Sequence, residues 1–466
     1  MDIIRKFFSV GNDRNGDVSS WSYVKKLYKA YWQVAWPASL EGIFLNLILL
    51  ADLVMVGELR ISAAAAVGIV SQPKMIMQLF GKSLGTGVTA VVARRRGENN
   101  LFGLNSCIKQ SLLITILLYV VLVYFAIAYR ENILLLMGAN SEYFDLAVIY
   151  FTYLTVALFF KSLSSVLSAV QVGVGNTSVI LRASVIGNII NVVFNYVLIF
   201  GHLGFPRLGI QGAAIATIIG EFIIFSVLLI SILFQDKDGI DIRNNGSIIF
   251  SKKVIWPVLE IGANSFFEQI FERVGLFIFA RLIAELGTVA VGTHHYCIIL
   301  WDLYYYFGLG MGTACASFAG RKLGEKRPEL AKIYMKIAQK SGIIISSIVS
   351  IIFLTMGTFL FKMMVVDDNV VNLGANIMMI VAVLIIPQTQ AQILTGVLRG
   401  AGDNRFIAKY SLFVSAIFRS ILAYVFAFIM NFGLYGIWYA LLVDEVLKMI
   451  FSKYRITKGI WITKNV

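Results

Sequence analysis

The chain has 466 residues, of which 58% are hydrophobic and 14% are charged, and its mean hydropathy is +0.80. A soluble domain carries roughly 25% charged residues, so this composition excludes a large globular protein and predicts a membrane protein. The formal net charge of +14 does not indicate a nucleic-acid partner, because the basic residues fall in short loops rather than on one face of a compact domain.

Apolar runs long enough to cross the hydrocarbon layer recur along nearly the whole chain, for example at 111–128, 342–361 and 410–430. Within lipid, only helices and closed barrels satisfy every backbone polar group. Barrel strands alternate apolar and polar residues with period two, whereas Leu112-Leu113-Ile114 does not alternate. The sequence therefore predicts an all-α polytopic membrane protein with twelve transmembrane helices.

The basic residues gather in alternate loops, for example at Arg94-Arg95-Arg96 and at Arg321-Lys322. By the positive-inside rule these loops are cytoplasmic, which places both termini in the cytoplasm of a cell with the protein in its inner (plasma) membrane. The first 30 residues are too polar to hold the apolar region of a cleavable signal peptide.

The first predicted span, about 31–57, contains Glu41 and Asp52. Eleven residues at about 100° each bring the two to nearly the same helix face, about three turns apart. A charge at mid-membrane costs about 2.5–3.5 kcal/mol on insertion scales, so we expect both carboxylates to face the first lobe or a central cleft. In the alternative interpretation, Asp52 lies near the outer interface and satisfies a helix end.

The fifth span carries Asn191 and Asn195, whose spacing of four stacks two amide groups on one helix face. Such amides also join helices without any transport role. Together with a carboxylate in the same bundle, however, they would supply the oxygen ligands that a hard cation or a proton relay needs.

The seventh span, about 254–283, contains Glu268, Glu272 and Arg273. The two glutamates lie one turn apart on one face, as expected for a pair that faces a substrate cavity. The alternative is a structural pair in which Arg273 neutralises one glutamate.

The eighth span contains an aromatic run in which Tyr305 could offer a π face to a cationic substrate, although such a run is more often explained by helix packing. No metal site is expected, because His294-His295 has no third ligand nearby. The three cysteines are widely spaced and predict neither a disulfide framework nor a zinc site.

The second half of the chain repeats the first at an offset of 227 residues, obtained by pairing Gly85 with Gly312. The same offset aligns Gly173-Val174-Gly175 with Gly400-Ala401-Gly402, and Gly209-Ile210 with Gly436-Ile437. Each copy contains an even number of spans, so the copies have the same orientation and form two pseudo-symmetric six-helix lobes with a substrate path between them.

These observations divide the chain into four parts. A cytoplasmic N-terminal segment covers 1–30, an N-lobe covers 31–235, a polar cytoplasmic linker covers 236–253, and a C-lobe with a cytoplasmic tail covers 254–466.

Several segments together resemble the multidrug and toxic compound extrusion (MATE) family, in its NorM-like bacterial branch. They are residues 51–57 (Ala-Asp-Leu-Val-Met-Val-Gly), 191–196, 286–288, 324–325 and 398–403 (Leu-Arg-Gly-Ala-Gly-Asp). The resemblance implies export of organic cations by alternating access of two lobes, coupled to protons or Na⁺ and without another cofactor. It puts the cation-coupling site on Asp52, with Asn191 and Asn195 beside it.

The resemblance also puts a second-lobe glutamate on Glu268. The branch often has an aspartate in the tenth span, but Gln388 stands at that position here, which gives the first-lobe site more weight. The substrate-binding residues expected from the spans and the resemblance are Glu41, Glu268, Glu272, Arg273, Gln388 and Tyr305.

The leading hypothesis is thus a monomeric antiporter in the lipid bilayer that exports small organic, cationic molecules. The alternative is a lipid-linked oligosaccharide flippase, which would need a strongly cationic cavity for pyrophosphate, whereas the charged candidates here are mostly acidic. An enzyme is not expected, because no nucleophile and base or metal constellation is present in the sequence.

Overall fold

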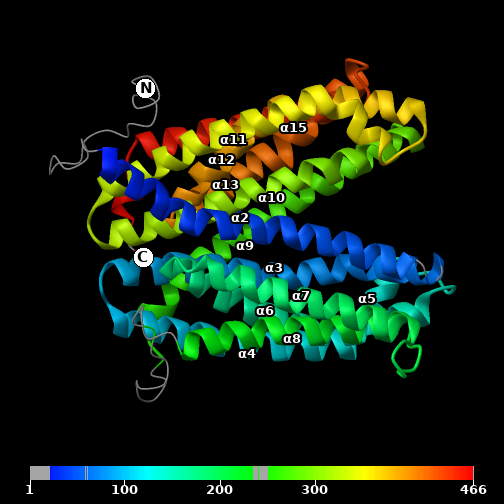
Figure 1. Ribbon diagram of the computed structural model, residues 1–466, viewed down its shortest axis with the longest axis horizontal. Helices are drawn as coiled ribbons and strands as arrows, with labels where there is room; N and C mark the ends of the chain where they lie inside the picture. Colours follow the sequence, from blue (N-terminus) through cyan, green and yellow to red (C-terminus); the bar gives the residue numbers. More distant parts are fainter. Residues whose placement is uncertain (1–20, 58, 60, 235–239, 241–249, 465) are drawn as a thin grey trace. The chain divides into compact units, whose positions relative to one another are not determined.

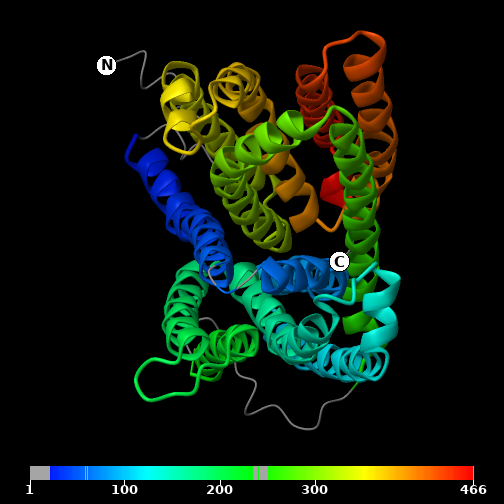
Figure 2. The same ribbon diagram turned by 90° about the vertical axis from the view of Figure 1, so that its right-hand side faces the viewer.

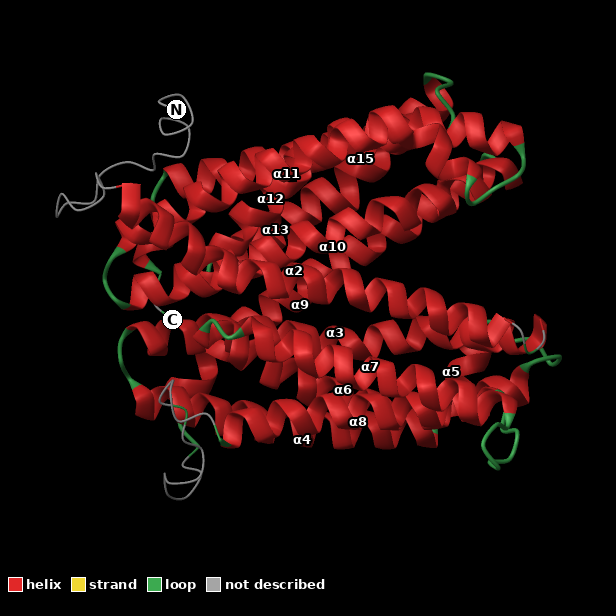
Figure 3. Cartoon of the chain, viewed as in Figure 1, coloured by secondary structure: helices red, strands yellow, loops and turns green. Residues whose placement is uncertain are grey.

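The computed structural model describes residues 21–57, 59, 61–234, 240, 250–464 and 466, without the side chains of 49–54 and 56. These residues are almost entirely helical, and no strand occurs among them (Figures 1 and 3). Helices satisfy their own backbone hydrogen bonds, which is what lipid demands of a spanning segment. Twelve long helical segments are described, so the predicted fold class is confirmed.

The first half of the chain supplies six of the long segments and one short helix. They are α2 (Trp21–Gly57), α3 (Ile61–Gly97), α4 (Leu101–Ala128), the short α5 (Arg130–Leu136), α6 (Phe144–Val174), α7 (Thr177–Phe200) and α8 (Ile210–Leu233).

The second half supplies the other six. They are α9 (Lys252–Glu285), α10 (Thr288–Gly324), α11 (Pro328–Lys362), α12 (Asp368–Gly400), a segment made of α13 (Asn404–Ser411), η3 (Leu412–Phe418), α14 (Arg419–Tyr424) and η4 (Val425–Ile429), and α15 (Leu434–Thr457). The short 3₁₀ turn η5 (Ile460–Thr463) follows.

Eight of the described helical segments are long and apolar enough to cross a bilayer. The chain is therefore a multi-pass membrane protein. α15 is not among the eight, and Asp444, Glu445 and Lys448 all lie within its apolar sequence.

The chain forms two compact units, unit 1 (Met1–Ile43 and Ala263–Val466) and unit 2 (Phe44–Gly262). The predicted lobes, 31–235 and 254–466, follow the sequence repeat instead. The two divisions differ because the first part of α2 packs within unit 1 and the first part of α9 packs within unit 2. For example, Tyr31 of α2 donates a hydrogen bond to the carbonyl of Met311 in α10, at 3.2 Å.

Each unit is a bundle of helices, many of which are seen nearly end-on in Figure 2. In unit 1, α12 packs against α10, α11 and α15. In unit 2, α6 packs against α3, α4 and α8 in the same way. The two central helices are equivalent in the repeat, so the copies share a packing pattern as well as sequence motifs.

The helix bounds follow the predicted offset closely through most of the chain. Adding 227 to the bounds of α3 gives 288–324, which are the bounds of α10. A Cβ on Gly85 would touch Ser165 of α6, and a Cβ on Gly312 would touch Gln392 of α12. The two contacts are also related by 227, but only Gly312 is sterically required, because an added Cβ would lie 2.5 Å from the Gln392 carbonyl there and 3.4 Å from Ser165 Oγ at Gly85.

The offset changes near the end of the chain, and the predicted pairing of Gly209 with Gly436 is wrong. The residue equivalent to Gly209 is Gly433, because the two precede α8 and α15 with nearly the same backbone angles (φ +57°, ψ −129° and φ +55°, ψ −133°). The offset falls to 224 because nine residues (201–209) separate α7 from α8, whereas only four (430–433) separate η4 from α15. The segment with the π-helical stretches η3 and η4 is two residues longer than α7 (26 against 24), which compensates for only part of this difference.

Candidate functional site: buried charges in unit 1

Glu268 lies on α9 and is only 5% exposed. Its carboxylate accepts a hydrogen bond from the guanidinium of Arg399, near the end of α12. The side chain of Arg399 is 32% exposed, so the pair reaches from the interior of the unit towards solvent. A carboxylate in a spanning helix needs such a partner, because lipid offers none.

Arg273 is exposed and does not neutralise Glu268, contrary to the structural pair considered from the sequence. α9 places it on a different face from Glu268, because five residues at about 100° each turn the helix by roughly 140° from the starting direction. The partner of Glu268 therefore comes from a distant segment and not from its own helix.

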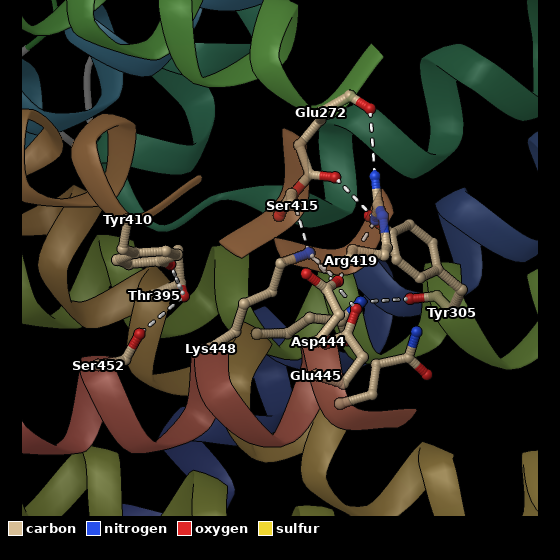
Figure 4. A network of polar contacts seen from close by, with 12 residues as sticks. Glu272, Tyr305, Thr395, Tyr410, Ser415, Arg419, Asp444, Glu445, Lys448 and Ser452 are labelled. Carbon is tan, nitrogen blue, oxygen red and sulfur yellow. Dashed lines mark hydrogen bonds and ion pairs between the residues drawn. The ribbon is translucent and has the colours of Figure 1, made fainter. Parts of the chain in front are cut away.

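Glu272, one turn after Glu268, is half-buried and contacts three side chains of two other segments (Figure 4). Its Oε1 accepts hydrogen bonds from Ser415 Oγ and Lys448 Nζ, each at 2.8 Å. Its Oε2 lies 3.4 Å from Arg419 Nη1. Glu272 thereby ties α9 to the segment that contains η3 and α14, and to α15.

Asp444 of α15 is 1% exposed and uses one oxygen for two cations. Its Oδ2 lies 2.8 Å from Lys448 Nζ and 3.3 Å from Arg419 Nη1. The neighbouring Glu445 is also buried, but its closest cationic atom is Lys448 Nζ at 3.7 Å. We call Glu272, Arg419, Asp444, Glu445 and Lys448 the α15 charge cluster.

The cluster contains one more acidic group than basic groups. Glu272, Asp444 and Glu445 stand against Arg419 and Lys448, while Glu268 and Arg399 beside them form a balanced pair. An uncompensated charge in a spanning segment is costly, so a proton or a bound cation is needed to balance the third carboxylate.

The predicted residues Gln388 and Tyr305 both lie next to Trp301 in unit 1. Gln388 of α12 is fully buried, and its Oε1 accepts a hydrogen bond from Trp301 Nε1 at 3.2 Å. The ring of Tyr305 lies 5.1 Å from that of Trp301. The backbone carbonyl of Tyr305 accepts a hydrogen bond from Gln392 Nε2 at 3.2 Å. The structure thus gives both residues packing contacts within the bundle.

Glu41 is half-buried on the part of α2 that belongs to unit 1. The side chain of Asp52 lies outside the described residues, so its predicted position on the same face is not described. The backbone of Asp52 is helical and belongs to unit 2. The first long helix therefore contributes its two carboxylates to different compact units.

Asn191 and Asn195 of α7 are both buried in unit 2. Nδ2 of Asn195 donates a hydrogen bond to Oδ1 of Asn191 at 3.3 Å, so the predicted stacking of the amides is present. Gly220 of α8 lets that helix come close, because a Cβ there would lie 2.8 Å from the Cβ of Asn191.

The sequence interpretation missed the charges of α15. Asp444 and Lys448, at a spacing of four in an apolar helix, are the signal that would have found them, since intramembrane charges are rare without a role. Arg419 binds the α15 charge cluster, and Glu221 pairs with Lys161 at 2.9 Å in unit 2.

A family model described as MatE matches residues 37–197 and again residues 265–425. The two matches are offset by 228 residues, in agreement with the repeat. Among curated proteins, the probable multidrug resistance protein NorM of Mannheimia succiniciproducens is 24% identical over 95% of this chain and 96% of its own length.

Two solved structures share the fold. The outward-facing conformation of a multidrug resistance MATE family transporter of the MOP superfamily has a TM-score of 0.85 at 21% identity, over 93% of this chain and 96% of that one. A MOP superfamily transporter from Pyrococcus furiosus, described as having a binding pocket of reverse polarity that suggests a different function, also has a TM-score of 0.85, at 20% identity over 94% and 97%. With the family model matching both halves, the chain belongs to the MatE (multidrug and toxic compound extrusion) family of membrane transporters, as a NorM-like member.

Proposed function

We propose that this transporter exports small organic cations from the cell in exchange for protons or Na⁺, by alternating access of its two lobes. Proteins named probable multidrug resistance protein NorM match this chain over nearly its whole length, which supports export of organic compounds. Within this proposal the protein is a monomer in the plasma membrane, with both termini in the cytoplasm and no cofactor besides the coupling ion.

The observation that carries the proposal is the set of buried ionisable side chains inside unit 1. Four carboxylates and three cations lie together in helices of a membrane protein, most of them buried, and the acidic groups are in excess by one. Such groups cost stability in a spanning segment and are retained where an ion or a charged substrate binds. Their acidic balance favours a cationic cargo.

Coupling to the ion gradient is proposed at Asp52, with Asn191 and Asn195 orienting the site. A coupling group must change between a charged and a neutralised state. A carboxylate does so by binding a proton or a cation, whereas an amide does not titrate. The buried and mutually bonded amides of Asn191 and Asn195 support an orienting role.

The test is transport in proteoliposomes that contain the purified protein and an imposed pH or Na⁺ gradient. A fluorescent quaternary ammonium dye serves as the cationic probe. We expect the dye to accumulate against its gradient only when one of the two ion gradients is present. Dye accumulation that does not depend on either ion gradient would overturn the antiport proposal. Asp52→Asn should abolish accumulation while dye binding persists, and normal accumulation by this variant would remove Asp52 from the coupling step.

The alternative is a flippase for lipid-linked oligosaccharides, whose pyrophosphate is anionic. The structural neighbour from Pyrococcus furiosus is described as having a binding pocket of reverse polarity, so the fold alone does not determine whether the substrate is a cation or an anion. The acidic excess of the α15 charge cluster argues against an anionic cargo here. A matched anionic dye in the same liposomes separates the two functions, since only a carrier of anions would move it in place of the cationic dye.

A further inference from the structure

The three carboxylates of the α15 charge cluster differ in how well the structure stabilises their negative charge. Glu272 accepts hydrogen bonds from Ser415 and Lys448, and its second oxygen contacts Arg419. Asp444 contacts the same two cations through Oδ2. Both are thus ionised partners of Arg419 and Lys448, and these four groups balance in charge.

Glu445 is the third carboxylate, and no hydrogen bond stabilises its charge in the described structure. The residue is 6% exposed, and Lys448 Nζ lies 3.7 Å from its Oε1, beyond hydrogen-bond distance. Lys448 is already bound at 2.8 Å by the other two carboxylates. An anion in this place would be buried, poorly solvated and close to two other anions, which favours its neutral form.

A second observation points to a missing hydrogen atom at the same place. Oδ1 of Asp444 is fully buried and has no hydrogen-bond partner among the described residues. A buried carboxylate oxygen without a donor is unusual and needs an explanation. Without a bound proton, the donors described in the cluster are Arg419, Lys448 and Ser415. A proton would convert one carboxylate into a further hydrogen-bond donor.

A metal ion is a poorer candidate than a proton for balancing the charge. In the part of the chain that the structure describes, no group of three or more acidic, cysteine or histidine residues is arranged to hold a metal. The ammonium of Lys448 already occupies the space that the three carboxylates share, and it would repel a second cation. A proton avoids this repulsion, because it bonds covalently to one oxygen.

We infer that Glu445 binds an exchangeable proton and is a proton-carrying group of unit 1, separate from Asp52. The O–H bond forms on a Glu445 carboxylate oxygen with a proton taken from water, and the reverse step returns that proton to water. The groups that act on Glu445 are Glu272 of α9, Tyr305 of α10, Arg419 of α14, and Asp444 and Lys448 of α15. This inference deepens the proposed antiport by naming a residue that holds the coupling ion.

The charge count gives a test that needs neither substrate nor gradient. The infrared band of protonated carboxylic acids is recorded for the purified full chain in lipid membranes near neutral pH, in H₂O and in D₂O. Glu445→Gln should lose the signal of one carboxylic acid relative to the wild type. Asp444→Asn should lose the same signal, because Glu445 then ionises to balance Lys448. Lys448→Gln should gain the signal of one further acid.

The matched control is Glu325→Gln, which removes a carboxylate whose two oxygens both accept a hydrogen bond from Lys322 Nζ, at 2.7 and 2.8 Å. This variant should leave the band unchanged. An unchanged band in both Glu445→Gln and Asp444→Asn would overturn the inference, as would Lys448→Gln without a gain. If Glu445→Gln does not fold, Glu445→Asp is the second variant, because it keeps a carboxyl group at this position and should keep the signal of one acid at a changed band frequency. Failure of dye transport with the expected band changes would count against the antiport proposal alone.

Discussion

Glu268 and Arg399 are 131 positions apart in the chain, and their side chains form an ion pair between α9 and α12. Glu268 has no basic residue within one helical turn, and Asp403, the acidic residue one turn after Arg399, pairs with Arg455 instead. The same relationship occurs in the α15 charge cluster, where Glu272 and Arg419 are 147 positions apart. The buried charges of unit 1 therefore connect helices that the sequence separates.

The Glu268 and Arg399 pair predicts a coupling between two substitutions. Glu268→Gln and Arg399→Gln should each lower the thermal stability of the purified protein, and the double variant should recover part of the loss. We expect a coupling free energy of about 0.5–3 kcal/mol, because each single change leaves one partner unpaired. Unfolding of the four proteins under one set of conditions measures it. Additive losses would show that the pair does not contribute, and would support a role of Glu268 in substrate binding alone.

Arg419 predicts a larger loss of stability. Arg419→Met leaves Asp444 and Glu272 with a single shared cation, and removing one partner of a buried ion pair costs about 3–5 kcal/mol. The matched control is Arg95→Met, whose partner Glu98 lies in the turn directly after α3, in a solvent-accessible pair at 2.8 Å. That change should cost about 1 kcal/mol or less. Similar melting temperatures for the two variants would contradict the prediction.

Gly396 predicts a packing defect between α12 and α10. A Cβ at this position would lie 2.1 Å from the backbone oxygen of Gly312, so Gly396→Ala must push the two helices apart. Overpacking of this kind costs about 1–3 kcal/mol. Gly292→Ala on α10 is the control, because no atom lies within 4 Å of the added Cβ and alanine favours a helix. Thermal unfolding should therefore separate the two variants, and equal stability would argue against the close helix contact.

The proposed orientation can be tested by cysteine labelling, because the native Cys107, Cys297 and Cys315 are all buried. Lys253→Cys, at the last residue of the predicted cytoplasmic linker, should react with a membrane-impermeant maleimide only after the cells are permeabilised. Val366→Cys, 98% exposed in the loop between α11 and α12, should react in intact cells. The opposite pattern would reverse the topology and the direction of the proposed export.

The sequence by itself determined the helical membrane fold, the number of long helices and the internal repeat. The physical reason is local, since a segment that crosses lipid must satisfy its backbone hydrogen bonds within itself and be apolar over its whole length. The neighbours of Gly85 and Gly312, which are Ser165 and Gln392, also follow the repeat. For such features, residues near one another in the sequence carry the information.

Only the tertiary structure decided which charges meet and how the units are divided. It paired Glu268 with Arg399 instead of Arg273, and it assigned the first part of α2 to unit 1. It also gathered Glu272, Arg419 and Lys448 from three segments into one cluster. An ion pair depends on the packing of whole helices, and the π-helical stretches η3 and η4 change the register on which that packing rests. No local pattern encodes these distances, so the surplus carboxylate of α15 could be recognised only once the helices were in place.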